Sequence, residues 1–120
     1  MTTDAPETGL VIRYEGPGVG TELWGGTQAN FQVFQPGAHA KEFAVLLQDA
    51  AAAQLASAAE AEDTPEFRER AARVVGALWL TRMIGAGRHV DPVAVLSRAA
   101  IDQAAGFLDE ARAALASSEA

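Results

Sequence analysis

The alternation of apolar and polar residues predicts short strands in the first third of the chain. Residues 10–15 alternate, residues 29–35 alternate again with Phe34 on the polar side, and residues 21–24 suit a further short strand. Glycine and proline dominate residues 16–20 and predict a turn. Because these connections are too short for a crossover, we expect an antiparallel β-hairpin or a three-stranded meander.

From about residue 38 the apolar positions change to helical spacing. Residues 38–61 repeat apolar side chains every three or four positions and are rich in alanine, which predicts a first helix. A threonine, a proline and a glutamate at 64–66 form a strong helix start and predict a second helix over residues 64–87. The Asp91-Pro92 pair repeats this start and predicts a third helix, with Gly106 in its middle.

The run Val74–Leu80 is the most apolar in the chain, so we expect it at the centre of the core. Gly76 marks the closest approach of another helix, for which Gly106 in the last helix is the expected contact. The neighbouring helices are rich in alanine and offer little area. We therefore expect a second subunit to bury part of this run, Trp79 and Leu80 first.

The order of the predicted elements is typical of an α+β fold, in which an N-terminal antiparallel β-hairpin or three-stranded meander precedes three α-helices. We expect residues 1–8 to form a flexible tail, residues 9–116 a single α+β domain, and residues 117–120 a frayed C-terminus.

Charge and composition narrow the classes of function. The 120-residue chain carries a net charge of −7, which argues against binding to nucleic acid or to an anionic membrane surface. It contains no cysteine, no secretory signal and no apolar run of membrane-spanning length, so we expect a cytoplasmic protein. Abundant alanine, with a single lysine against eight arginines, is typical of a GC-rich bacterial genome.

The chain shows no convincing catalytic motif. Residues 20–27 nearly match the phosphate-binding loop, but Gly26 replaces its lysine and the following pattern is that of a strand. No serine lies in a nucleophile elbow. The two histidines, His39 and His89, are too few for a metal site without distant ligands. We therefore predict no catalytic residue, no metal and no cofactor.

The basic residues are unevenly distributed. Six of the nine lie between positions 66 and 98, and this span has a net charge of +3 while the rest of the chain has −10. A solvated helix face with Glu66–Arg70 and Glu69–Arg73 pairs explains this pattern most simply. A basic strip that meets an acidic partner is the alternative.

The favoured function is a non-catalytic protein-binding or assembly module, as in a small homodimeric bacterial accessory or regulatory protein. Edge strands and alanine-rich helix faces are surfaces where a second chain can add. Large aromatic side chains and arginines are enriched at such interfaces. The candidate partner-binding residues are Trp24, Phe34, Arg68, Arg73 and Trp79.

The alternative function is a small-molecule-binding protein or an enzyme, with a pocket between the sheet and the helices. Such pockets are apolar and carry a few convergent polar groups. Tyr14, His39 and Glu42 are the residues expected to supply those groups, beside the two tryptophans.

Overall fold

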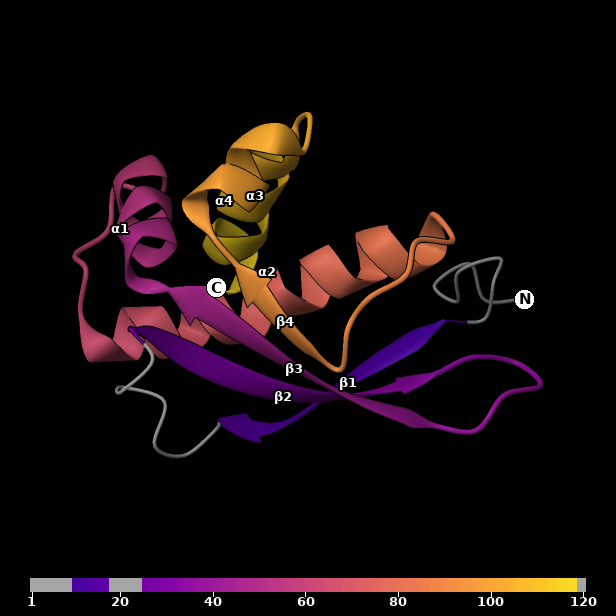
Figure 1. Cartoon of the computed structure of the whole chain (residues 1–120). Helices are drawn as coiled ribbons and strands as arrows, with labels where there is room; N and C mark the ends of the chain where they lie inside the picture. Colours follow the sequence, from indigo (N-terminus) through magenta and orange to yellow (C-terminus); the bar gives the residue numbers. More distant parts are fainter. Residues whose placement is uncertain (1–9, 18–24, 119–120) are drawn as a thin grey trace.

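A computed structural model describes residues 10–17 and 25–118 of the protein. The elements follow the order β1 (Val11–Pro17), β2 (Gly26–Phe34), β3 (Lys41–Gln48), α1 (Asp49–Ala58), α2 (Pro65–Gly85), β4 (Val93–Leu96), α3 (Arg98–Gln103) and α4 (Phe107–Ser118) (Figure 1). The predicted α+β class is confirmed. The predicted number of elements is wrong, because the described chain forms a four-stranded mixed sheet and four helices.

The strands lie side by side in the order β1-β2-β3-β4. β1 pairs with β2, and β2 with β3, in antiparallel fashion, so a three-stranded meander does form. Its third strand is β3, whereas the strand suggested at residues 21–24 lies outside the described residues. β4 pairs with β3 in parallel, after α1 and α2 have carried the chain back along the sheet.

The helix predicted from residue 38 is wrong in its first part, because Lys41–Gln48 forms β3. Its apolar residues, from Phe43 to Leu47, form a continuous run. A run of this length fits a buried strand as well as a helix, and spacing does not separate the two. β3 lies between β2 and β4 and is paired on both sides, which decides the outcome. The alanine-rich remainder is helical as expected, in α1.

The single helix predicted after Asp91-Pro92 is also wrong. Val93–Leu96 forms β4, with side chains that alternate between exposed and buried. Ser97 then caps α3, since its hydroxyl accepts a hydrogen bond from the backbone N–H of Ala100 at 3.1 Å. Gly106 lies between α3 and α4 at a φ of 73°, a conformation that favours glycine, and not within a helix.

The long helix α2 starts as predicted. The hydroxyl of Thr64 accepts a hydrogen bond from the backbone N–H of Phe67 at 3.0 Å, and Pro65 occupies the first turn. α2 packs on β1, β2 and β3 and also contacts α4. Within the described ranges, no helix has the length and apolar character needed to cross a bilayer.

The apolar run in the middle of α2 lies at the core, as expected, but it faces the sheet. Val75, Gly76 and Leu80 are buried. A side chain at Gly76 would begin 3.1 Å from the ring of Phe31 and 3.5 Å from Val45. α2 therefore packs closely on β2 and β3 at Gly76, and the predicted contact of Gly76 with the last helix is wrong.

Candidate functional site

The sheet has one face packed on the helices and one face turned away from them, which we call the open face. Cross-strand register determines its composition, because residues opposite one another share a face. Val11 lies opposite Phe34, Leu46 opposite Val95, and Ala44 opposite Val93. The polar members of this face include Arg13, Gln28, Asn30, Gln32 and Glu42.

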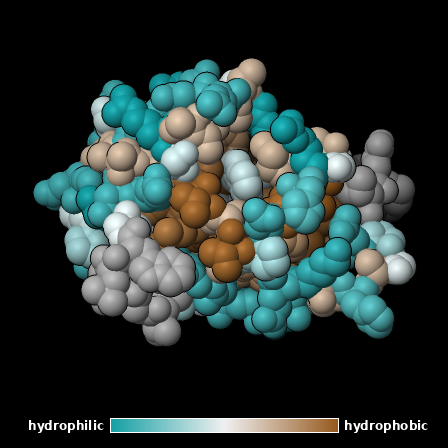
Figure 2. Space-filling model, in the orientation of Figure 1, coloured by the Kyte–Doolittle hydropathy of each residue, from teal (hydrophilic) through white to brown (hydrophobic). Residues whose placement is uncertain are grey.

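The open face carries the most exposed large apolar side chains that the structure describes. Val11 is 53% exposed, Val93 52% and Val95 48%. Figure 2 views the molecule from this side and shows hydrophobic side chains gathered near its centre, with hydrophilic ones around them. Leu46 lies between these positions but is only 4% exposed, beside Gly26, where a side chain would begin 3.1 Å from it. Val93 and Val95 lie together on β4, whereas Val11 lies on β1 at the opposite edge, beyond the polar side chains of β2. An exposed apolar patch such as that on β4 is typical of an interaction surface.

The two edges of the sheet differ. β1 is interrupted by a register shift between Tyr14 and Gly16, and it carries an Arg13–Glu15 ion pair at 3.6 Å. Bulges and charges of this kind discourage the addition of a further strand. The sequence of β4 is Val-Ala-Val-Leu, with no charge and no bulge. β4 is therefore the less protected edge.

The candidate partner-binding residues do not converge on one surface. Phe34 lies on the open face, partly buried opposite Val11. Arg73 lies on the helix side, where its guanidinium is 5.9 Å from the centre of the Tyr14 ring. Arg68 belongs to an ion-pair cluster, described below. Trp24 lies outside the described residues.

The chain itself buries more of the apolar middle of α2 than expected, and leaves less of it for a second subunit to cover. Leu80 is completely buried within the chain, so that part of the prediction is wrong. Trp79 is half-buried and packs against the core from its edge. The sheet and the neighbouring helices together bury more of the apolar surface of α2 than the alanine-rich helices alone were expected to bury.

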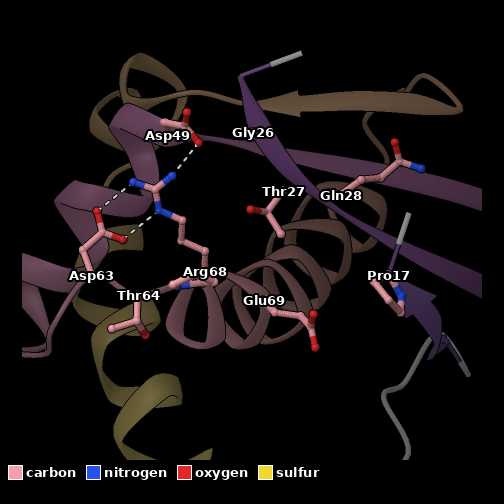
Figure 3. Close-up of a pocket in the computed structure, with 10 residues that line it drawn as sticks. Pro17, Gly26, Thr27, Gln28, Asp49, Asp63, Thr64, Arg68 and Glu69 are labelled. Atoms are coloured by element: carbon pink, nitrogen blue, oxygen red, sulfur yellow. Dashed lines mark hydrogen bonds and ion pairs between the residues drawn. The ribbon is translucent and has the colours of Figure 1, made fainter. Parts of the chain in front are cut away.

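A cavity of about 540 Å³ lies where the start of α2 meets the end of β1, the start of β2 and the start of α1 (Figure 3). Arg68 lies at its wall. The Nε and Nη2 atoms of Arg68 donate to the two carboxylate oxygens of Asp63 at 2.8 and 2.9 Å, and Nη1 donates to Asp49 at 2.9 Å. Two carboxylates already match its charge, so Arg68 joins the helix starts together and does not offer a free cation to an acidic partner.

Arg68 makes stability depend on pH through Asp63. Its hydrogen bonds hold the pKa of the Asp63 carboxyl below the ordinary value, since they favour the ionised form. A lowered pKa contributes stability above the pKa of the unfolded chain, about 3.9, and this is lost as pH falls through the folded-state value.

We expect Arg68→Met to lower the free energy of unfolding at pH 7 by about 1 kcal/mol, because Arg68 and Asp63 are about one-third exposed to solvent and Asp49 about half. The difference from the wild type should shrink below about pH 4, where Asp63 is protonated in the unfolded chain and then in the folded one. Urea unfolding between pH 7 and pH 3 measures this. Arg88→Met removes the same charge from an exposed site and is the control. A difference that is constant with pH would contradict the assignment.

The residues of the predicted ligand pocket are not brought together. Tyr14 lies on the helix side, with its ring 5.8 Å from that of Phe31 in an edge-to-face arrangement. Burial, and then the nearby carboxylate of Glu69, raise the pKa of the Tyr14 phenol, while Arg73 opposes this rise. Glu42 lies exposed on the open face, and His39 is exposed in the turn between β2 and β3.

A second cleft, of about 460 Å³, lies between the start of β3 and the segment that follows α2. Phe43, Ile84 and Val90 give it an apolar lining, and cationic groups come from Lys41 and Arg88. Of the predicted pocket residues it contains Glu42, without Tyr14 or His39. It therefore does not assemble the predicted site.

Comparison of the chain with protein-family models, with curated proteins and with solved structures found no match in any of the three. The function proposed below therefore rests on the geometry of the open face.

Proposed function

We propose that the protein is a non-catalytic protein-binding module that assembles with itself through the open face of its sheet. The observation that carries this proposal is the position of Val11, Val93 and Val95. All three are about half exposed, and all three lie on the one face of the sheet that the described helices leave uncovered. Water contact with such side chains is unfavourable by roughly 25 cal/mol per Å², so burial against another surface is favourable.

Two further observations support a binding role over a catalytic one. The polar residues of the open face include the amides Gln28, Asn30 and Gln32 on β2, which can hydrogen-bond across an interface. In addition, Tyr14 and Glu42 lie on opposite faces of the sheet, and His39 lies in the turn between β2 and β3. A small-molecule site at those residues therefore has no support in the arrangement of the side chains.

We expect Val95→Lys to weaken self-association by at least about tenfold, because it places a charge in the apolar part of the open face. Sedimentation velocity over a range from low micromolar to several hundred micromolar protein measures the dissociation constant. Ala113→Lys adds the same charge at an exposed position of α4 and should leave association unchanged. Equal weakening by both variants, or by neither, would contradict the assignment of the open face.

A further inference from the structure

We infer that the second copy adds at β4, in antiparallel orientation, with a two-fold axis beside Ala94. The two four-stranded sheets would then form one continuous sheet. This inference rests on the self-association proposed above, and it places the contact at the β4 edge of the open face, where Val93 and Val95 lie, and not across the whole face. It is carried by the direction of the backbone groups of β4, by the match between its exposed side chains, and by the charges at its two ends.

The hydrogen bonds between β3 and β4 fix which backbone groups are free. The N–H of Ala44 donates to the carbonyl of Pro92 at 2.8 Å, and Ala44 lies opposite Val93. In a parallel ladder such a residue bonds to both neighbours of its opposite number, here Pro92 and Ala94. The N–H and C=O of Val93 therefore point away from β3, and with the two-residue period those of Val95 do the same.

No other described residue hydrogen-bonds to these outward groups of Val93 and Val95. A strand with unpaired backbone groups is a template for another strand. The free groups and the exposed side chains belong to the same two residues. A chain that adds there gains backbone hydrogen bonds and apolar contacts together.

A second copy fits this edge because the edge is complementary to itself. With a two-fold axis beside Ala94, Val93 lies opposite Val95 of the partner subunit, and Val95 lies opposite Val93 of the partner subunit. In an antiparallel ladder each of these Val93–Val95 pairs forms two backbone hydrogen bonds. The backbone groups of both strands that point away from β3 are thereby all paired. All four valines lie on the open face, where opposite β-branched side chains stabilise a pair of strands.

The charges beside β4 favour the same arrangement. Asp91 precedes the strand and Arg98 follows it, and both are exposed. The two-fold pairing brings Asp91 next to Arg98 of the partner subunit, and the same pair recurs at the other end. Each chain carries a net charge of −7, so general repulsion opposes dimer formation. Two local pairs of opposite sign reduce that repulsion in the antiparallel orientation and not in the parallel one.

The register is tested by disulfide formation, since the chain contains no cysteine of its own. In the inferred register, position 93 of one chain lies opposite position 95 of the other, with Cα atoms about 5.5 Å apart, within the range of a disulfide. Like positions are diagonal neighbours, about 7–8 Å apart and beyond that range. Val93→Cys and Val95→Cys are oxidised separately and as an equimolar mixture, and a non-reducing gel measures linked dimer.

We expect several times more linked dimer in the mixture than in either variant alone. Val11→Cys, equally exposed on the same face but at the opposite edge, should give little linked dimer. Equal linkage in the single variants and the mixture, linkage through Val11→Cys alone, or no linkage in any sample would overturn the inferred register.

A second experiment separates edge pairing from packing of one open face on another. Val95→Pro removes an N–H that points away from β3. The hydrogen bonds from β4 to β3 are unaffected, because they come from the residues on either side of Val95. We expect it to weaken the dimer at least tenfold in sedimentation velocity, while Val11→Lys leaves the dimer intact. Circular dichroism verifies the fold, and Val95→Lys replaces the proline variant if that variant unfolds.

The outcomes distinguish the two proposals. If Val95→Pro keeps the dimer while Val11→Lys and Val95→Lys both dissociate it, edge pairing is overturned and the open face stands. If none of the three changes the dimer, both proposals fail. A chain that stays monomeric at several hundred micromolar overturns self-association, and with it the inferred dimer.

Discussion

Replacing Phe31 with alanine should lower the free energy of unfolding by about 3–5 kcal/mol. Phe31 is 1% exposed, and its ring lies between the sheet and α2, against Gly76. It also meets the ring of Tyr14, with 5.8 Å between the ring centres. Removing it leaves a cavity that the surrounding strands cannot close. Urea unfolding followed by circular dichroism measures the loss.

Phe34→Ala is the matched control for this prediction. It removes the same side chain from the same strand, but from the open face, where Phe34 is partly exposed opposite Val11. We expect a loss of less than about 1.5 kcal/mol, since less apolar area returns to water and no enclosed cavity forms. Equal losses for both variants would mean that the helix side of the sheet is not the core.

Replacing Gly76 with valine should destabilise the protein by about 2 kcal/mol through overpacking. Its new Cβ alone would lie 3.1 Å from the Phe31 ring and 3.5 Å from Val45, and both side chains are buried. The gain in helix propensity over glycine is smaller, under about 1 kcal/mol. Thermal and urea unfolding measure the net effect.

Gly85→Ala provides the comparison, because nothing lies within 4 Å of a Cβ at that position of the same helix. This variant should match or slightly exceed the stability of the wild type. Combining Gly76→Val with Phe31→Leu should cost less than the sum of the two single losses, since the smaller side chain leaves room. Strict additivity would show that the two positions do not touch.

The parts of the fold that local chemistry determines were predictable. Thr64 and Pro65 marked the start of α2, and alternation marked β1 and β2, including the outward direction of Phe34. β3 was not predictable in this way. Its apolar run suits helix and strand equally, and pairing with β2 on one side and with β4, which is distant in sequence, on the other selects the strand.

The candidate site was less accessible from the sequence than the fold. The Asp91-Pro92 pair has the form of a helix start, and this concealed the alternation of the four residues after it. Val93 and Val95 were therefore assigned to a helix and not to an open sheet face. The β-branched residues at both positions were the available signal, since such residues favour strands. Which side chains are exposed together on one face depends on how the strands assemble into the sheet, and the sequence around each residue does not indicate it.

The way in which β4 joins the sheet links assembly to folding. The meander β1-β2-β3 pairs segments that are neighbours in the chain, whereas α1 and α2 separate β4 from β3 along the chain. Pairing across so long a loop costs more conformational entropy, and such contacts form late and open early. β4, through which two copies are inferred to meet, is thus the strand whose pairing within its own chain is the least stable. Dimer formation would stabilise that pairing.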